Sequence, residues 1–325
     1  MNESECILEV VIATYEEFLI GYKLKQENDK YTFEQSFTNH AHTGSVRSIS
    51  CSQKYLASGS TDESIRIFCL MKRVDVGTVV EQQGTINCLQ FFEQSHLFSC
   101  SEDSTICVWD VHNWECLKTL RGHKAGVNYI SVHPSGKLLL SVSKDKTLRT
   151  WNLIKGRCAY ITNLKAIASA VVWSPSGTLF AVLFDKRVDI YDISVGDVIH
   201  SMPFEQKANC VCFLTKNMVA IGAENGKIEL HNVETKSVIA TLEAHSSRVK
   251  DLFVVPSLNS WLFSLSSDGV LKLWEFDHSN LNKKAKLVAS VNSTCRANRL
   301  TVWVPNGDSH SSVEEEKPIK RKKIK

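Results

Sequence analysis

Apolar and polar residues alternate along the chain in short runs that predict strands. Residues 7–14 (ILEVVIAT) form one apolar run, and residues 17–24 and 31–38 form two more, each separated from the next by a short polar turn. The aromatic and β-branched residues in these runs favour extended structure. No apolar stretch reaches the length of a membrane-spanning helix. The pattern predicts an all-β protein.

A fixed repeat in the chain identifies the architecture. In the most complete copy, Asp145 follows Gly122-His123 by 22 residues, and Trp151-Asn152 comes six residues later. The residues at the Trp position recur at intervals of 40–46, namely Tyr22, Phe68, Trp109, Trp151, Tyr191, His231 and Trp274. Six residues before each stands an acid or an amide: Glu16, Asp62, Asp103, Asp145, Asp185, Asn225 and Asp268. This is the period of a four-stranded propeller blade.

The first three predicted strands lack the inner strand of their blade, and the other end of the chain supplies it. Residues 303–307 (WVPNG) align with residues 173–177 (WSPSG), which end the first strand of another repeat. We therefore expect residues 299–304 to close a seven-bladed β-propeller over residues 1–307. Closure removes the sheet edges that would template aggregation, so deleting either terminus is expected to open the ring.

A buried polar chain explains why these residue types recur. The Asp accepts a hydrogen bond from the His, whose other ring nitrogen reaches a Ser hydroxyl that also meets the Trp indole N–H. Three blades carry the residues for it: His42 and Asp62 in blade 1, with Phe68 at the Trp position; His123, Asp145 and Trp151 in blade 3; His245, Asp268 and Trp274 in blade 6. The hydroxyl is expected from one of each pair Ser58 and Ser60, Ser141 and Ser143, Ser264 and Ser266.

Blades 2, 4 and 5 lack the His. Gln83 stands near that position in blade 2, and unrelated residues near 163 and 205 do so in blades 4 and 5. We expect these three blades to be held mainly by apolar packing.

Composition narrows the class of protein. The eleven Cys residues have no metal-ligand spacing, so we expect reduced thiols, no metal and no cofactor. The first five residues are acidic where a signal peptide would be basic, which predicts a soluble intracellular protein. The His residues at blade positions have no nearby nucleophile or paired acid, and no phosphate-binding glycine loop is present, so no enzyme activity is expected.

Charge is distributed unevenly, although the net charge is only +3. Between Lys118 and Arg157 there are nine basic residues and a single acid, a net charge of +8 within one blade. Such a region attracts anionic partners, RNA phosphate or an acidic peptide. The alternative is that strand alternation spreads these side chains over both faces as solvated charges. The candidate patch is Lys118, Arg121, Lys124, Lys144, Lys146, Arg149, Lys155 and Arg157.

The last eighteen residues differ in composition from the repeats. They are Ser-rich, then acidic, then basic, and we predict that residues 308–325 form a disordered tail. Without the final thirteen residues the chain has 32 basic and 32 acidic residues, so the basic excess lies in the tail. We expect nuclear or nucleolar targeting, with a nucleic-acid arm or a solubilising tail as alternatives. The basic residues are Lys317, Lys320, Arg321, Lys322, Lys323 and Lys325.

Residues 1–305 resemble the WD-repeat family, and several segments narrow the resemblance. These segments are 37–43 (FTNHAHT), 114–118 (WECLK), 133–138 (HPSGKL), 145–153 (DKTLRTWNL) and 248–251 (RVKD), together with Ala244-His245. Combined, they resemble the family of p21-activated kinase-interacting proteins, whose yeast member is a maturation factor of the large ribosomal subunit.

The resemblance implies a nucleolar scaffold for assembly of the 60S precursor, which also binds the regulatory region of p21-activated kinase and restrains its activation. The implied partners are pre-60S assembly factors and that regulatory region, with ribosomal RNA as a further candidate. We expect a monomer within larger complexes and no membrane association. The main alternative is a propeller that binds RNA directly through blade 3. A ubiquitin-ligase substrate receptor ranks last, because no adaptor-binding segment is expected ahead of the blades.

Overall fold

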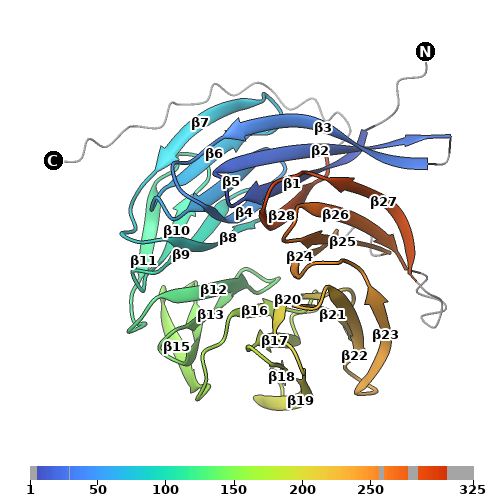
Figure 1. Cartoon of the computed structure of the whole chain (residues 1–325). Coiled ribbons are helices and arrows are strands. Elements are labelled where there is room, and N and C mark those ends of the chain that lie inside the picture. Colours follow the sequence, from blue (N-terminus) through green and yellow to red (C-terminus); the bar gives the residue numbers. More distant parts are fainter. Residues whose placement is uncertain (1–5, 29, 256–259, 277–284, 306–325) are drawn as a thin grey trace.

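Seven four-stranded antiparallel sheets make up the described part of the chain. The computed structural model describes residues 6–28, 30–255, 260–276 and 285–305, and in these ranges it contains twenty-eight strands and no helix. The sheets are arranged as blades around a central axis (Figure 1). The seven-bladed β-propeller predicted from the repeat is therefore confirmed.

Within each blade the strands follow one another outward from the axis. The closing blade contains β28 (Ala297–Trp303), β1 (Cys6–Thr14), β2 (Phe18–Glu27) and β3 (Lys30–His40). Blade 1 contains β4 (Val46–Cys51), β5 (Tyr55–Ser60), β6 (Ile65–Cys69) and β7 (Val74–Val79). Blade 2 contains β8 (Ile86–Phe92), β9 (His96–Ser101), β10 (Ile106–Asp110) and β11 (Cys116–Leu120). Blade 3 contains β12 (Val127–Val132), β13 (Leu138–Ser143), β14 (Thr147–Asn152) and β15 (Arg157–Asn163).

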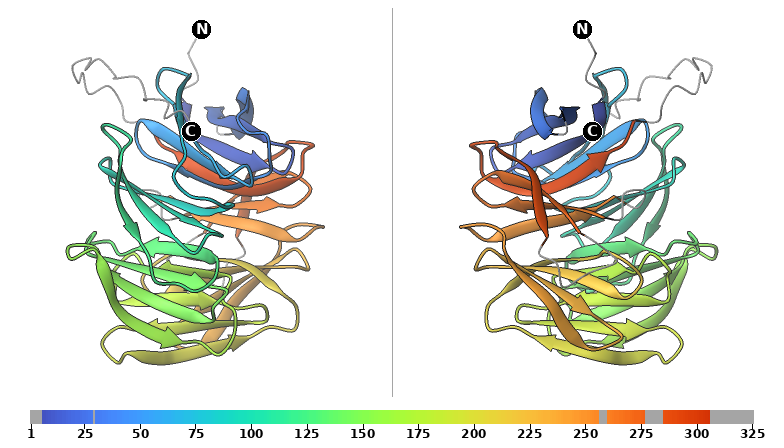
Figure 2. Two further views of the ribbon diagram at one scale, coloured as in Figure 1. Left: turned by 90° about the vertical axis from the view of Figure 1, so that its left-hand side faces the viewer. Right: turned by 90° about the vertical axis from the view of Figure 1, so that its right-hand side faces the viewer.

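The other three blades repeat this order. Blade 4 contains β16 (Ala170–Trp173), β17 (Leu179–Leu183), β18 (Arg187–Asp192) and β19 (Asp197–Pro203). Blade 5 contains β20 (Ala208–Phe213), β21 (Met218–Ala223), β22 (Lys227–Asn232) and β23 (Ser237–Glu243). Blade 6 contains β24 (Val249–Val254), β25 (Trp261–Ser266), β26 (Val270–Glu275) and β27 (Lys286–Asn292). The turns between strands lie on two opposite faces of the ring (Figure 2).

Ring closure joins the two ends of the sequence. Strand β28 pairs antiparallel with β1, with Val302 opposite Val10 and Leu300 opposite Ile12. Both strands bury these side chains in one apolar cluster, because the closing blade packs against blade 6 there. The predicted closing strand is present, although it begins two residues before and ends one residue before the predicted range 299–304.

A buried ion pair fastens the closing blade to blade 1. The Glu9 carboxylate on β1 is fully buried and accepts hydrogen bonds from Arg73 Nη1 at 3.0 Å and Arg73 Nη2 at 2.7 Å. Arg73 lies in the turn after β6, with its guanidinium over the rings of Phe37 and Trp303. Ser36 adds a third bond to Glu9. One arginine thus neutralises a buried carboxylate at the seam where the ring closes.

Every blade is bulged at the repeat position predicted from sequence. The pairing between the third and fourth strand shifts by one residue immediately before Tyr22, Phe68, Trp109, Trp151, Tyr191, His231 and Trp274. A bulge bends a strand and increases its twist, which suits the strongly twisted outer half of a blade. The seven-fold register derived from sequence therefore has a geometric counterpart in every blade.

The core is divided among the interfaces between blades. Seven apolar clusters occur in the described residues, one for each pair of neighbouring blades. The ten cysteines whose side chains are described are free thiols. In the described ranges, no helix has the length and apolarity needed to cross a bilayer.

Candidate functional site

The polar chain is complete in blade 3. His123 Nδ1 lies 2.9 Å from Asp145 Oδ2, and its Nε2 lies 2.7 Å from Ser141 Oγ. Trp151 Nε1 donates to the same hydroxyl at 2.8 Å. A neutral imidazole with its proton on Nδ1 satisfies every member, because Ser141 then donates to Nε2 while accepting from the indole. Ser141 is thus the hydroxyl in the chain, whereas Ser143 donates to Ala125 O.

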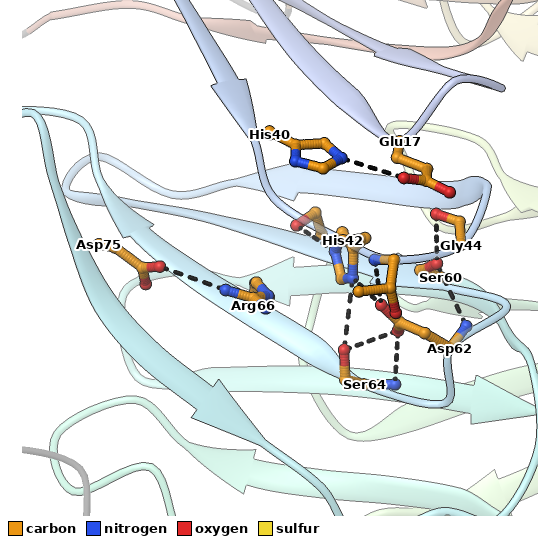
Figure 3. Close-up of polar contacts among 11 residues, drawn as sticks. Glu17, His40, His42, Gly44, Ser60, Asp62, Ser64, Arg66 and Asp75 are labelled. Carbon is orange, nitrogen blue, oxygen red and sulfur yellow. Dashed lines mark hydrogen bonds and ion pairs between the residues drawn. The ribbon is translucent and has the colours of Figure 1, made fainter.

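Blade 1 has the same chain without an indole. His42 Nδ1 lies 2.9 Å from Asp62 Oδ2 and His42 Nε2 lies 2.8 Å from Ser58 Oγ, while Phe68 occupies the Trp position. Asp62 also accepts from the Thr43 amide and from Ser64 (Figure 3). The carboxylate therefore holds the loop before β4 against the turn before β6.

Blade 6 departs from the predicted set. His245 Nε2 and Trp274 Nε1 both meet Ser264 Oγ, at 2.8 and 2.9 Å. Asp268, however, accepts from Ser266, and no bond between Asp268 and His245 is among the described contacts. Lys272 lies close to the imidazole and donates to Ala244 O. In the described contacts the chain of blade 6 therefore runs from the Trp274 indole through Ser264 to His245, and the predicted bond from His245 to Asp268 is not among them.

The expectation that blade 2 is held mainly by apolar packing is wrong, because this blade contains a continuous polar chain of its own. Gln82, not Gln83, occupies the His position: it accepts from Ser99 Oγ at 2.5 Å and donates to Thr105 Oγ1 at 3.0 Å. Trp109 Nε1 donates to Ser99 at 2.9 Å. Sequence analysis missed this because an amide was not considered as a replacement for imidazole.

Blades 4 and 5 match the expectation of apolar packing. In blade 4, Leu164, Val182 and Tyr191 stand where blade 3 has His123, Ser141 and Trp151. In blade 5 the His position holds Phe204, whose ring packs edge-on against His231 at 5.7 Å. Neither blade has a hydroxyl at the position of Ser141, so no hydrogen-bond partner is needed there.

Burial keeps the histidines of these chains neutral. It lowers the pKa of His123 and His42, although the bonds from Asp145 and Asp62 oppose the shift, and it lowers the pKa of His245 to about 4, with help from Lys272. Burial alone would raise the pKa of Asp145, but bonds from Thr147, the Lys124 amide and His123 bring it well below its usual value. These His and Asp side chains therefore have a structural role, and each stays in one protonation state near neutral pH.

The basic residues of the candidate patch are divided between the two faces of the ring. We call the face that carries His42, His123 and His245 the tetrad face. The strand order places Arg121, Lys124, Lys144 and Lys146 in loops at the tetrad face, and Lys155 and Arg157 in or next to the turn at the opposite face. Lys118 lies beside Gly156, and Arg149 is buried against Gly122. The eight residues therefore do not form one continuous surface.

A cavity opens at the tetrad face of the central channel. It has a volume of about 840 Å³ and is lined by all seven inner strands or the loops that precede them. On six inner strands the pairing with the second strand skips one residue, and each skipped residue lines the cavity: Arg47, Asn87, Asn128, Asn209, Lys250 and Asn298. Ser169, immediately before β16, completes the ring. Bulges commonly redirect side chains into binding sites.

Three of these asparagines have a structural task. The side-chain amide of each donates to a carbonyl of the next inner strand or the loop before it: Asn87 to Val127, Asn128 to Ala168 and Asn298 to Val46, at 2.8–2.9 Å. Arg47 and Lys250 occupy equivalent positions and make no such bond in the described contacts. The ring residues recur at intervals of 40–48 residues, a signal that was present in the sequence and not used.

The remaining predicted site lies outside the described residues. The basic cluster from Lys317 to Lys325 and the predicted disordered tail fall in the range 306–325. Within the described residues, no group of three or more His, Cys, Asp or Glu side chains is placed to hold a metal ion.

Comparison with known proteins places the chain in a family. The family model "WD domain, G-beta repeat" matches residues 32–69, 74–110 and 114–152, and the model "Eukaryotic translation initiation factor eIF2A" matches residues 155–287. The chain is 38% identical to the zebrafish (Danio rerio) "p21-activated protein kinase-interacting protein 1-like", covering 96% of this chain and 86% of that protein. It belongs to the p21-activated protein kinase-interacting protein 1 family.

More distant members of this family extend the comparison. The human (Homo sapiens) "p21-activated protein kinase-interacting protein 1" is 35% identical over 96% of this chain and 80% of its own length. "Protein MAK11" of Saccharomyces cerevisiae is 30% identical over 82% of this chain and 77% of its own length. A WD-repeat propeller is a protein-interaction scaffold, and the animal relatives are named as interaction partners of a kinase.

Proposed function

We propose that this protein is a non-enzymatic scaffold in the nucleolus that takes part in assembly of the large ribosomal subunit, and that it binds the regulatory region of p21-activated kinase and restrains its activation. The observation that carries the kinase part is the name and coverage of the relatives, which match 96% of the chain. "Shk1 kinase-binding protein 15" of Schizosaccharomyces pombe, 27% identical, also carries a kinase partner in its name. The ribosomal part is supported by the resemblance to the yeast maturation factor and by the basic C-terminal cluster.

The ribosomal proposal is tested by purification of the tagged full-length chain from a nuclear extract, with and without nuclease. We expect pre-60S assembly factors to remain bound after RNA is digested and the tagged chain to sediment with pre-60S particles. Absence of the chain from those particles would overturn this part of the proposal. A matched chain lacking residues 317–325 tests localisation, since nucleolar accumulation is expected to fall when that cluster is removed.

The kinase proposal is tested with purified components. The isolated regulatory region of p21-activated kinase should retain the full-length chain, and adding the chain should reduce stimulation of the kinase by its activator. If a saturating concentration of the chain left stimulation of the kinase unchanged, this result would count against inhibition. If the regulatory region did not retain the chain, this result would count against binding.

Direct RNA binding is the second candidate function. Arg121, Lys124, Lys144 and Lys146 are exposed or partly exposed at one face of blade 3, although Lys144 is already paired with Glu102 at 2.5 Å. Binding through three or four of these residues predicts an affinity for single-stranded RNA that falls about 20- to 50-fold between about 50 and 200 mM salt. Loss of pre-60S factors after nuclease treatment would favour this function over a protein scaffold.

A further inference from the structure

Three neighbouring inner strands direct cations into the channel cavity at the tetrad face. Lys250 on β24, Arg299 on β28 and Arg47 on β4 all line the same space. Arg299 is compensated, because its Nη1 lies 3.4 Å from Asp251 Oδ1. Among the described residues, neither Lys250 nor Arg47 lies within 4 Å of a carboxylate oxygen; Arg47 instead lies over the Tyr15 ring at 5.9 Å. This side of the cavity therefore holds more positive than negative charge.

This concentration of charge is unfavourable for the isolated chain. Lys250 is half-buried, and burial together with Arg248, Arg299 and Arg47 lowers the pKa of its ammonium group, with Glu224 only partly opposing them. Four equivalent ring positions hold asparagine in other blades, so the backbone bulge does not require a cation there. Uncompensated like charges at a concave site indicate that the missing counter-charge comes from a partner.

The other side of the cavity narrows the choice of partner. Glu102 and Asp185 lie there, each paired with a lysine: Lys144 at 2.5 Å and Lys207 at 3.4 Å. A nucleic acid carries phosphate at every residue and would meet these two carboxylates as well as the cations. The lining also contains no aromatic side chain on which a base could stack, a contact that single-stranded nucleic-acid sites commonly use. A peptide with acidic side chains at particular positions fits the asymmetry better.

We infer that the channel mouth at the tetrad face binds an acidic peptide segment of a protein partner, with Arg47 and Lys250 receiving its carboxylate groups. The cavity volume of about 840 Å³ is within the range of known ligand sites. Arg299 lines the same cavity but is paired with Asp251, so Arg47 and Lys250 supply the charge that is not compensated. The inference deepens the proposed scaffold function and rests on it only for the identity of the partner.

The test uses the purified full-length chain and a fluorescein-labelled hexapeptide that carries two adjacent glutamates among uncharged residues, followed by fluorescence anisotropy at low salt. Lys250→Met and Arg47→Gln remove the charge and keep much of the side-chain length, and each is expected to weaken binding at least about tenfold, the cost of one charge-assisted contact. Lys155→Met is the matched control, because Lys155 is exposed at the opposite face and lies outside the cavity. Its affinity should stay within about twofold of wild type.

Thermal unfolding separates loss of binding from loss of folding. The peptide should raise the melting temperature of wild type and of Lys155→Met by similar amounts, and should raise that of Lys250→Met by less, since stabilisation by a ligand of the native state grows with its affinity. Without peptide, Lys250→Met should melt no lower than wild type.

Two results would overturn the inference. One is equal affinity of the peptide for wild type, Lys250→Met and Arg47→Gln. The other is tighter binding of a labelled hexauridylate that depends on the same two residues, which would make the mouth an RNA site. Because the assay needs only the purified chain, its failure is distinguishable from absence of the protein from pre-60S particles or from the kinase.

Discussion

Blades 3 and 4 are neighbours with the same strand order, but they differ in the residues at the His, Ser and Trp positions. In blade 3 a chain of hydrogen bonds runs from the Trp151 indole through Ser141 and His123 to Asp145. In blade 4 the corresponding positions hold Leu164, Val182 and Tyr191, buried or partly buried in an apolar cluster in which Tyr191 stacks on Phe180 at 4.8 Å.

The difference shows that a blade can be stabilised by a polar chain or by apolar packing, provided that every buried polar group has a partner. A buried hydroxyl or imidazole is costly only when its partner is missing, so one polar member placed alone in blade 4 is expected to destabilise it. Asp185, the turn residue of blade 4, has no imidazole to bind and instead lines the channel beside Lys207. Because blade 4 has no polar chain, the Asp185 carboxylate can line the cavity instead.

The largest expected effect is at the Trp position. Trp151→Ala removes a side chain that is 2% exposed and leaves Ser141 without its donor, so we expect a loss of about 3–5 kcal/mol in the free energy of unfolding. Tyr191→Ala, at the partly exposed counterpart in blade 4, should cost less. Urea unfolding followed by tryptophan fluorescence measures both. If the two variants lost equal free energy of unfolding, the polar chain would contribute no stability beyond that of apolar packing.

A reciprocal exchange at the central position is expected to have the next largest effect. Ser141→Val leaves His123 Nε2 and Trp151 Nε1 without partners, and Val182→Ser places a lone hydroxyl in an apolar cluster. We expect about 2–4 kcal/mol of destabilisation for the first and about 1–3 kcal/mol for the second. The triple variant Leu164→His, Val182→Ser, Tyr191→Trp supplies partners for that hydroxyl next to Asp185. A higher free energy of unfolding for the triple variant than for Val182→Ser alone, measured by urea unfolding, would show that the hydroxyl is tolerated when all its partners are present.

Sequence alone predicted the elements that repeat and missed those that differ between blades. The repeat of residues 22 to 274 was sufficient to predict seven blades and the strand supplied by residues 299–304, because spacing is imposed on every blade. It was not sufficient for Asp268, whose carboxylate turns to Ser266, or for Gln82, which replaces an imidazole by shape. Such choices depend on which hydroxyl is nearest in space, and spacing along the chain does not encode that distance.

The channel site shows the same limit. The sequence pointed to blade 3 because its basic residues are close together along the chain, yet the fold divides them between two faces. Arg47, Lys250 and Arg299 are far apart in the sequence, and the ring brings them to one cavity. Charge density in sequence is a weak guide in a propeller, since each blade distributes its residues over both ends.

Acid should affect the two kinds of blade differently. The unfolded chain binds protons at His residues near pH 6.5, whereas burial lowers the folded pKa of His42 and His123, and that of His245 to about 4. Between those values the unfolded state binds more protons, so the free energy of unfolding falls as the pH is lowered from 6.5 toward 4. Amide hydrogen exchange at pH 7 and pH 5 should show a greater loss of protection in blades 1, 3 and 6 than in blade 4. A uniform loss would contradict this assignment.

The smallest effect is expected in blade 2, where the polar chain exists without an ionisable group at the His position. It runs from the Trp109 indole to Ser99, Gln82, Thr105 and Asp103, every member being bonded to the next at 2.5–3.0 Å. Gln82→His at pH 7.5 should therefore change the free energy of unfolding by no more than about 1 kcal/mol, because a neutral imidazole also donates at one nitrogen and accepts at the other. The same substitution should make blade 2 more sensitive to acid, since the imidazole titrates and the amide does not. Gln82→Ala is the matched control: it removes all three hydrogen bonds of the side chain, is expected to cost about 1–3 kcal/mol, and should add no dependence on pH. If Gln82→His were as damaging at pH 7.5 as Gln82→Ala, the position would require the length of an amide, and blade 2 would represent a third solution distinct from those of blades 3 and 4.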